Sequence, residues 1–250
     1  MPTPRPAPPD TSVTSGAPVT SSTPTWHERH GRYPRADSVA DFQRNLAAVR
    51  ERIAAACRRA GRDPGEVRLL PVSKTFDAAH LRLAYAAGCR QLGENKVQEA
   101  QCKWEALDSL RLAEALDRRL QAEGRGLDVF VQINTSGEAS KYGLAPQEAA
   151  AFLRALPAFG ALRVRGLMTL ALFSAEAARV RACFALLRQL RDRLRQDAPA
   201  GIGLDELSMG MSGDFEIAIE EGATVVRVGQ AIFGARALPD SHYWPTDGAP

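Results

Sequence analysis

The sequence predicts an α/β fold: a TIM-type (β/α)8 barrel that is short of one strand–helix unit, with an extra N-terminal helix and disordered tails. Three observations predict it. Short apolar runs alternate with amphipathic stretches along most of the 250 residues, which is typical of a parallel sheet with helices outside. Glycines and polar side chains gather where the apolar runs end, at the rim where such barrels carry their chemistry. One interval is too short for a complete barrel.

The chain divides into one folded unit and two tails. Residues 1–35 are rich in Pro, Ser and Thr and hold almost no large apolar side chains, so they cannot bury enough surface to order themselves. Residues 36–237 carry the alternating pattern and form the predicted barrel. Residues 238–250 look equally unstructured, and we expect a second disordered tail there.

The extra helix comes first. Ser38 and Asp41 form a capping signal, and apolar residues then recur at steps of three and four until Gly61 ends the pattern. Strands and helices alternate after it. We predict strands over residues 67–72, 89–93, 128–134, 162–170, 204–209 and 224–228, and helices over residues 77–87, 146–157, 174–194, 214–222 and 230–234.

The interval between the second and third predicted strands does not fit a complete barrel. Residues 96–127 number 32, whereas two more strands with their helices need roughly twice that, since one βαβ unit takes about 30 residues. The apolar spacing from Val97 to Leu120 predicts helix almost throughout, with Glu105 to Ser109 as an alternative stub strand. A barrel that lacks a strand has two unpaired edges.

Composition excludes several function classes. The net charge is only +3 and no basic block stands out, so nucleic acid is not an expected partner. No apolar stretch reaches the roughly 18 residues that span a bilayer, so we expect no membrane partner. The cysteines form no C-x-x-C pair and none lies at metal spacing from a histidine, which predicts no metal site and suits a cytoplasmic, reducing location. These cysteines are Cys57, Cys89, Cys102 and Cys183.

Lys74 stands where the strand over residues 67–72 ends. A lysine at the mouth of a parallel sheet is well placed for covalent chemistry on a carbonyl, because partial burial lowers the pKa of its amine. Taken alone, the fragment better suits a surface lysine at a strand end, and the rest of the chain reverses that preference.

Two glycine-containing turns follow the last two predicted strands. Gly210, Ser212 and Gly213 permit close backbone approach before a helix, and Gly229 does so after Arg227. Phosphate groups often bind at this position in barrels, although plain glycine turns are common. A lysine, a phosphate cradle and an arginine on one rim together indicate pyridoxal phosphate.

Seven short motifs, in this order, resemble the pyridoxal phosphate homeostasis proteins, which share the barrel of fold-type III enzymes such as alanine racemase. The resemblance implies that Lys74 is the Schiff-base lysine and that Arg227 faces the pyridine nitrogen. It also implies that Met211, Ser212, Gly229 and Gln230 hold the phosphate, and that Asn95 and Met209 line the ring. The motifs occupy residues 72–74, 93–95, 132–134, 140–143, 165–168, 207–212 and 226–229.

The same resemblance locates the short interval. Family members carry a His-Phe-Ile-Gly-like strand and a further helix after the Gly-Glu-Asn turn and its helix. Here residues 104–107 lead straight into residues 108–113, which resemble a point about one βα unit later. We interpret this as an internal deletion, either natural or an artefact of the gene model.

Three functions follow from these observations. The family implies a cytoplasmic pyridoxal 5′-phosphate binder in vitamin B6 and amino-acid homeostasis, not an enzyme, with PLP-dependent apo-enzymes as conceivable recipients.

The first alternative is an amino-acid racemase, which needs two bases on opposite faces of the ring. Tyr85 and Tyr142 match no motif for the second base, and the fold ends near Arg236. A protonated arginine also keeps the ring nitrogen neutral, which makes the ring a weak electron sink. The second alternative is a deletion-damaged member that binds PLP poorly.

Overall fold

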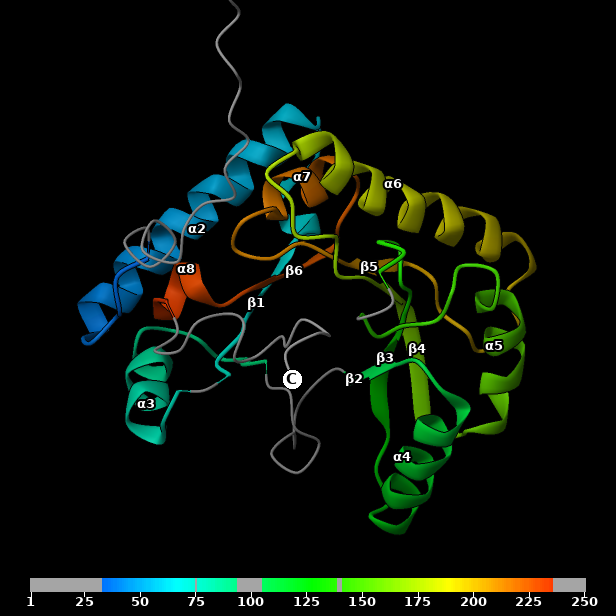
Figure 1. The fold of residues 1–250 in the computed structure, drawn as a ribbon. Coiled ribbons are helices and arrows are strands. Elements are labelled where there is room, and N and C mark those ends of the chain that lie inside the picture. Colours follow the sequence, from blue (N-terminus) through cyan, green and yellow to red (C-terminus); the bar gives the residue numbers. More distant parts are fainter. Residues whose placement is uncertain (1–32, 75, 94–104, 139–140, 236–250) are drawn as a thin grey trace, which may run out of the picture.

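A curved parallel sheet forms the centre of the protein. The computed structural model describes residues 33–74, 76–93, 105–138 and 141–235 (Figure 1). The sheet has six strands in the order β1-β6-β5-β4-β3-β2, and every pairing is parallel. Because the last strand lies beside the first, the chain runs around the sheet as it does in a barrel. The strands are β1 (Arg68–Pro71), β2 (Glu105–Leu107), β3 (Leu127–Gln132), β4 (Leu162–Met168), β5 (Glu206–Ser208) and β6 (Val225–Val228).

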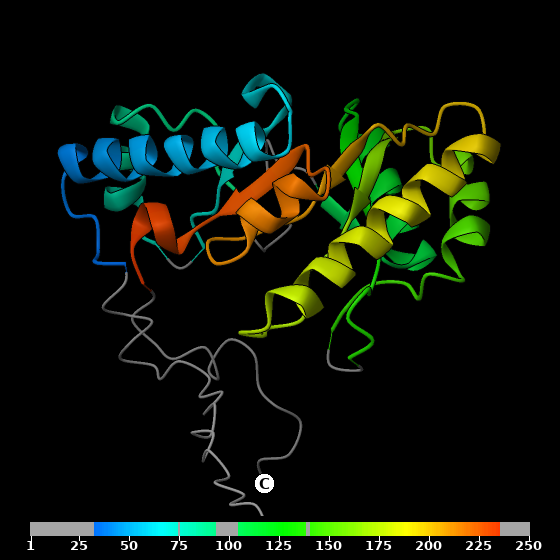
Figure 2. The same ribbon diagram turned by 90° about the horizontal axis from the view of Figure 1, so that it is seen from above.

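The helices lie on the outer side of this sheet (Figure 1). Seen from above, α2, α7 and α6 follow one another across the molecule, and α7 contacts both of the others (Figure 2). The predicted alternation of strands and external helices is therefore confirmed. The helices are α2 (Val39–Arg59), α3 (Ala78–Ala86), α4 (Leu110–Ala122), α5 (Ala149–Ala155), α6 (Ala177–Leu194), α7 (Phe215–Glu220) and α8 (Gln230–Phe233).

Helix α2 is the predicted extra helix. Ser38 is its N-cap, and the Ser38 hydroxyl accepts a hydrogen bond from the Asp41 N–H at 3.1 Å. Its apolar face is buried, with Phe42 fully enclosed. Ion pairs then join α2, α7 and α6: Arg59 lies 2.9 Å from Glu220, and Arg181 lies 2.8 Å from Glu221. Pairs exposed to this degree contribute little each, so buried apolar contacts carry the packing.

The short interval holds a strand where the apolar spacing favoured helix. Residues Glu105–Leu107 form β2, and Ala106 pairs with Phe130 of β3. The predicted helix is wrong there and the alternative stub strand is confirmed. Helix α4 starts only after Ser109, whose hydroxyl accepts from the Leu112 N–H at 3.3 Å. A short apolar run has no decisive period, and the open edge of β3 determines its structure.

The strand predicted over residues 89–93 does not form, so this prediction is wrong. Only Gly93 pairs, in an isolated parallel bridge with Val72. The Gly93 N–H donates to Pro71 O at 2.7 Å, and Gly93 O accepts from the Ser73 N–H at 3.0 Å. The backbone at Gly93 is thus attached just beyond the end of β1, although the preceding residues pair with no strand among the described residues.

The first described residues belong to the folded body. The Ala36 N–H donates to Phe233 O at 3.2 Å, and the Ala235 N–H donates to Tyr33 O at 2.9 Å. Tyr33 and Ala36 are therefore attached to the end of α8, while residues 1–32 of the predicted tail lie outside the described residues. Gly234 makes the contact possible, since a side chain there would place its Cβ 2.4 Å from Arg35 Cα.

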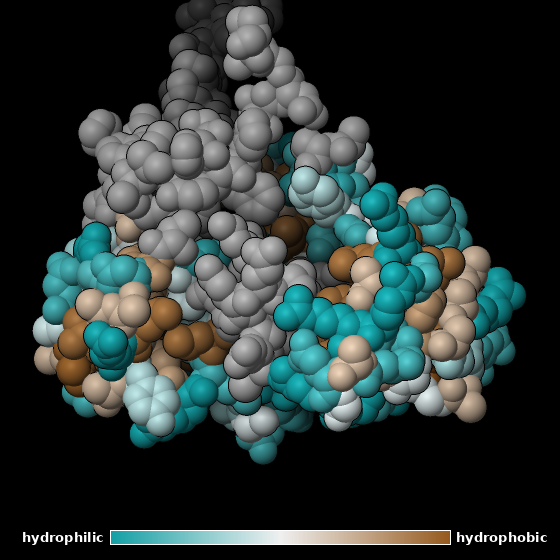
Figure 3. All heavy atoms as spheres, turned by 90° about the horizontal axis from the view of Figure 1, so that it is seen from below, coloured by the Kyte–Doolittle hydropathy of each residue, from teal (hydrophilic) through white to brown (hydrophobic). Residues whose placement is uncertain are grey.

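Hydrophobic side chains fill the space between helices and sheet, including Phe184, Leu187, Leu207 and Phe215, which are fully buried. On the lower face of the molecule, hydrophobic residues are also visible on the side where α3 lies (Figure 3). Within the described ranges, no helix has the length and apolar character to cross a membrane.

Candidate functional site

The sheet order brings three predicted segments to one end of the molecule. Lys74 follows β1, Arg227 and Gly229 belong to β6 and its end, and Ser212 follows β5. Because β1, β6 and β5 are neighbours and parallel, their C-terminal ends lie side by side. Asn95 lies outside the described residues.

Lys74 leaves the sheet from a fixed backbone. The Val72 N–H donates to Val228 O at 2.9 Å, and Ser73 is fully buried with its N–H on Gly93 O. Lys74 itself is partly buried. The lysine stem therefore starts from a rigid position at the mouth of the sheet, which is what a covalent anchor requires.

Three aromatic rings join the segment after Lys74 to α8. The ring centroids of Phe76 and Phe233 are 5.1 Å apart, and those of Phe233 and Phe42 are 5.2 Å apart. Such aromatic contacts add to the stabilisation from burial alone. Phe76 thus links the backbone beyond Lys74 to the helix that follows Gly229.

The two glycine turns are joined by one hydrogen bond. The Ser212 hydroxyl oxygen accepts from the Ala231 N–H at 3.2 Å. Within the described part of the chain, no hydrogen bond uses the backbone N–H groups of Ser212, Gly213, Gly229 or Gln230. Ser212 is nonetheless buried. Backbone N–H groups without protein acceptors on two linked turns fit an anion such as a phosphate.

Close packing explains Gly210 and Gly229 in these turns, whereas a Cβ at Gly213 would meet nothing within 4 Å. Gly210 has φ +95°, and a Cβ there would lie 2.7 Å from Ala218 Cβ. A Cβ at Gly229 would lie 3.1 Å from Val72 O, so β6 can end close to the segment that carries Lys74.

Arg227 lies inside the sheet and is bound to two neighbouring strand ends. Its Nη1 donates to the Ser208 hydroxyl at 2.8 Å and its Nη2 to Thr169 O at 2.9 Å. Burial lowers the pKa of Arg227 to about 10, against the opposing effect of Asp214. The guanidinium stays protonated at neutral pH. Its Nε–H makes no hydrogen bond to any described residue and remains available to a ligand acceptor.

Asp214 is a site residue that sequence reasoning placed only at a helix start. Burial raises its pKa, while a hydrogen bond from the Met211 N–H and the charges of Arg227 and Lys141 oppose the rise. The Met211 N–H donates to Asp214 Oδ1 at 2.5 Å. This carboxyl therefore holds the turn before α7. Ser208 and Thr169 were missed as partners of Arg227, because only the register of the strands brings them to it.

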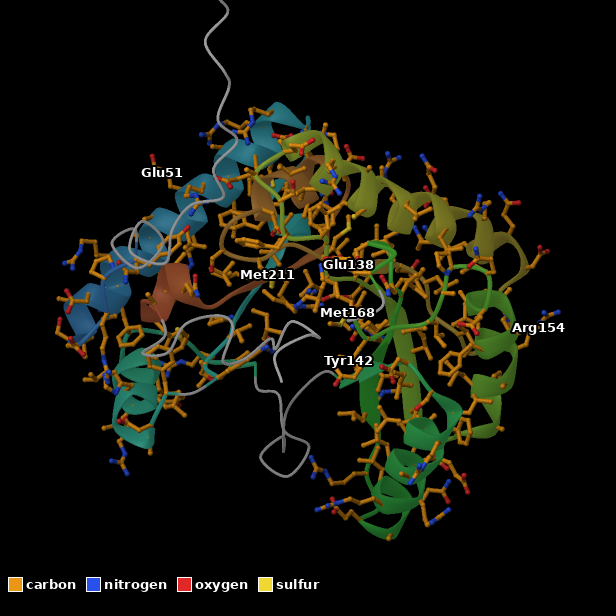
Figure 4. The ribbon with its side chains drawn as sticks, viewed as in Figure 1. Glu51, Glu138, Tyr142, Arg154, Met168 and Met211 are labelled. Carbon is orange, nitrogen blue, oxygen red and sulfur yellow. The ribbon has the colours of Figure 1, made fainter. Side chains whose placement is uncertain are left out.

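The two methionines predicted for the site differ in exposure. Met209 is fully buried beneath the turn, whereas Met211 is 39% exposed. Figure 4 shows Met211 on the same side of the sheet as Glu138, Met168 and Tyr142, while Glu51 and Arg154 lie on outer helices. Among the described residues, no group of three His, Cys, Asp or Glu side chains could hold a metal ion.

Comparison with known proteins identifies relatives. Residues 102–237 match the family model "Alanine racemase, N-terminal domain". The pyridoxal phosphate homeostasis protein of Pseudomonas aeruginosa is 43% identical over 229 residues, covering 79% of this chain and 97% of the relative. The protein of the same name from Escherichia coli K12 is 37% identical over 230 residues, covering 78% of this chain and 97% of the relative.

Solved structures agree with these matches. PipY from Synechococcus elongatus, solved with PLP bound, is 34% identical with a TM-score of 0.65 and covers 77% of this chain and 100% of its own. A protein from Bifidobacterium adolescentis is 32% identical with a TM-score of 0.72, covering 82% of this chain and 100% of its own. Alanine racemase from Corynebacterium glutamicum is 18% identical with a TM-score of 0.58, covering 80% of this chain and 62% of its own, and shares the fold alone.

Proposed function

This chain belongs to the pyridoxal phosphate homeostasis protein family, and we propose that it binds pyridoxal 5′-phosphate and serves intracellular vitamin B6 and amino-acid homeostasis. One observation carries the proposal. Lys74, Arg227 and the N–H groups around Ser212 and Gly229, which have no acceptor among the described residues, lie at the ends of adjacent parallel strands. An aldehyde anchor, a phosphate cradle and a fixed cation are the groups that this cofactor needs.

Each group has one role in the proposal. Lys74 holds the cofactor through an imine between its Nζ and the aldehyde carbon, formed with loss of one water. Ser212 and Gly229 present N–H groups to the phosphate, with Met211 and Gln230 beside them. Arg227 would face the pyridine nitrogen, and Met209 would line the ring. Asn95, which lies outside the described residues, is proposed to complete the ring contacts by resemblance alone.

The site favours holding the cofactor over turning over an amino acid. When bound to an enzyme, pyridoxal phosphate acts as an electron sink, most effectively with a protonated ring nitrogen. Arg227 is protonated at neutral pH and donates, so it keeps an acceptor nitrogen unprotonated. Tyr85 and Tyr142 are 58% and 75% exposed, which is a poor setting for the second base of a racemase. We therefore propose a carrier in the cytoplasm, with PLP-dependent apo-enzymes as recipients.

The test is covalent trapping. The protein is incubated with PLP, reduced with borohydride, and the adduct is located by mass spectrometry among Lys74, Lys96, Lys103 and Lys141. We expect the adduct at Lys74 and none there in Lys74→Arg. Absence of a Lys74 adduct in the wild type would sink the proposal. Racemisation of alanine by the loaded protein, lost in Lys74→Arg, would replace the carrier with the enzyme.

We also propose that the chain lacks one strand–helix unit between Gly93 and β2. Residues 94–104 alone separate them, too few for a unit of about 30 residues. The alignment with the Pseudomonas relative runs over 229 residues, more than the 79% of this 250-residue chain that it covers. Tyr85 on α3 and Leu110 on α4, the helices on either side of the interval, are both exposed.

Sequencing genomic DNA and transcript across codons 93–110 tests this second proposal. We expect the sequence as printed, and an intact protein mass of 27.0 kDa. Extra in-frame codons that encode a strand and a helix would contradict it. In that case the short interval belongs to the gene model and the native barrel is complete.

A further inference from the structure

The carbonyl oxygen of Ser212 is held from the side of α2. The Tyr33 hydroxyl donates to it at 3.1 Å, and Arg52 Nη2 donates to it at 3.4 Å. Both donors are distant in sequence, by 179 and 160 residues. Ser212 is only 7% exposed, so these bonds lie where water competes little. The phosphate turn is therefore attached to a part of the chain outside the strand-end loops.

Arg52 is itself fixed in place. Its Nε and Nη2 donate to the two carboxylate oxygens of Glu216 at 2.8 and 2.9 Å. Its guanidinium carbon lies 4.4 Å from the ring centroid of Phe215. A bidentate carboxylate pair combined with an aromatic face restricts a guanidinium strongly. The hydrogen bonds to Glu216 also raise the pKa of Arg52, so it remains a cation.

Holding this carbonyl has a consequence for the next residue. The described backbone contains no cis peptide bond. In a planar trans peptide unit, the C=O of one residue and the N–H of the next point in opposite directions. Directing Ser212 O toward Tyr33 and Arg52 therefore directs the Gly213 N–H away from them. That N–H has no acceptor within the described residues.

We propose that Arg52 and Tyr33 are positioning residues for the cofactor phosphate: by holding Ser212 O, they orient the Gly213 N–H as a phosphate donor and strengthen it. This rests on the proposed function, because it assigns the phosphate to that turn. A peptide group whose carbonyl accepts hydrogen bonds is polarised, which makes its N–H a better donor. Neither side chain contacts the phosphate; both act through one peptide unit.

The proposal gives α2 a part in ligand binding. The helix precedes the first strand and lies outside the strand–helix alternation of the sheet. Arg52 lies on α2 and Glu216 on α7, so their ion pair fixes α2 to the helix that begins directly after the turn. Displacement of α2 would then weaken phosphate binding through the turn that carries Ser212.

The test compares ligands with and without the phosphate. Dissociation constants of PLP and of pyridoxal are measured by absorbance titration for the wild type, Arg52→Gln and Tyr33→Phe. We expect the preference for PLP over pyridoxal to fall about tenfold in Arg52→Gln and about threefold in Tyr33→Phe, as for a weakened hydrogen bond to a charged group. Pyridoxal affinity should stay unchanged.

Arg59→Gln is the matched control. Arg59 lies on the same helix and pairs with Glu220 of α7 at 2.9 Å, without a hydrogen bond to Ser212. Arg59→Gln should lose an ion pair between α2 and α7 but keep the full preference for PLP. Arg52→Lys, which keeps the charge but not the planar fork, should fall between wild type and Arg52→Gln, and it serves with Tyr33→Phe if Arg52→Gln does not fold.

An unchanged preference in the Arg52 and Tyr33 variants overturns the inference. So does an equal weakening of both ligands, which indicates a general structural effect, or an equal fall in Arg59→Gln. Failure of the wild type to form the Lys74 adduct is a different result, since it removes the proposed function itself.

Discussion

Arg227 Nη1 lies 2.8 Å from the Ser208 hydroxyl, on the neighbouring strand β5. Its Nη2 donates to Thr169 O, just after β4. One guanidinium therefore links the ends of three adjacent parallel strands. The link requires a planar group with diverging donors, which arginine has and lysine lacks.

Arg227→Lys should therefore weaken the site while keeping its charge. Lysine cannot reach both Ser208 and Thr169 in the geometry of the guanidinium, so we expect PLP affinity to fall about tenfold or more. Absorbance titration with PLP measures this. Ser208→Ala, which removes only one of the two bonds, should lose about threefold. Wild-type affinity in Arg227→Lys would contradict this role.

Gly210 and Gly213 should respond differently to substitution. At Gly210, φ is +95° and a Cβ would meet Phe215 Cα at 2.8 Å, so Gly210→Ala should cost about 3 kcal/mol of unfolding free energy. A Cβ at Gly213 would meet nothing within 4 Å, so Gly213→Ala should cost less than about 1 kcal/mol. Urea unfolding of the ligand-free proteins compares them. Equal losses would show that crowding does not determine the glycine at residue 210.

Asp214 should make stability depend on pH in a definite direction. Burial raises its pKa above the ordinary value of 3.8. The folded protein therefore holds this proton more tightly than the unfolded chain, and stability is lost as the pH rises through the raised pKa. Asp214→Asn has no carboxyl to ionise, so it does not lose this stability, and its amide oxygen can still accept the hydrogen bond from the Met211 N–H. Its stability relative to wild type should rise as the pH increases above 3.8.

Urea unfolding at several pH values measures this difference. The exposed Asp197 supplies the control, since Asp197→Asn removes one carboxylate without altering a buried contact. A relative stability of Asp214→Asn that stays flat or falls with pH would contradict the direction.

The alternation of strands and helices and the helix α2 follow from the sequence because their signals are long or local. Ser38 and Asp41 cap the helix as predicted, since capping depends on residues three apart. Lys74, Arg227 and Gly229 were placed at strand ends by the apolar runs before them. Because β1 and β6 are neighbouring parallel strands, the C-terminal ends that carry these residues lie side by side.

Other parts of the site depend on contacts between distant residues. The bonds of Ser212 O to Tyr33 and Arg52 join residues more than 150 positions apart, and no local pattern marks them. Residues 105–107 become β2 because β3 offers a partner edge, which a helical period in the sequence does not reveal. A polar residue in a tail-like composition, such as Tyr33, gives no signal of burial.

The contact between Phe76 and Phe233 supports the last prediction. Phe76 stands two residues after Lys74, and its ring lies 5.1 Å from that of Phe233, which packs in turn against Phe42. Phe76→Ala removes this packing and should lower the unfolding free energy by about 2 kcal/mol, since the ring is only partly buried. It should also reduce the yield of the Lys74 adduct at limiting PLP, because the backbone beyond the lysine loses its attachment to α8.

The control is Phe173→Ala, at a ring that is 66% exposed, where we expect the unfolding free energy to fall by less than about 1 kcal/mol. Thermal unfolding and quantitative mass spectrometry follow the two effects. A stability loss without a change in adduct yield would limit Phe76 to folding and exclude it from positioning Lys74.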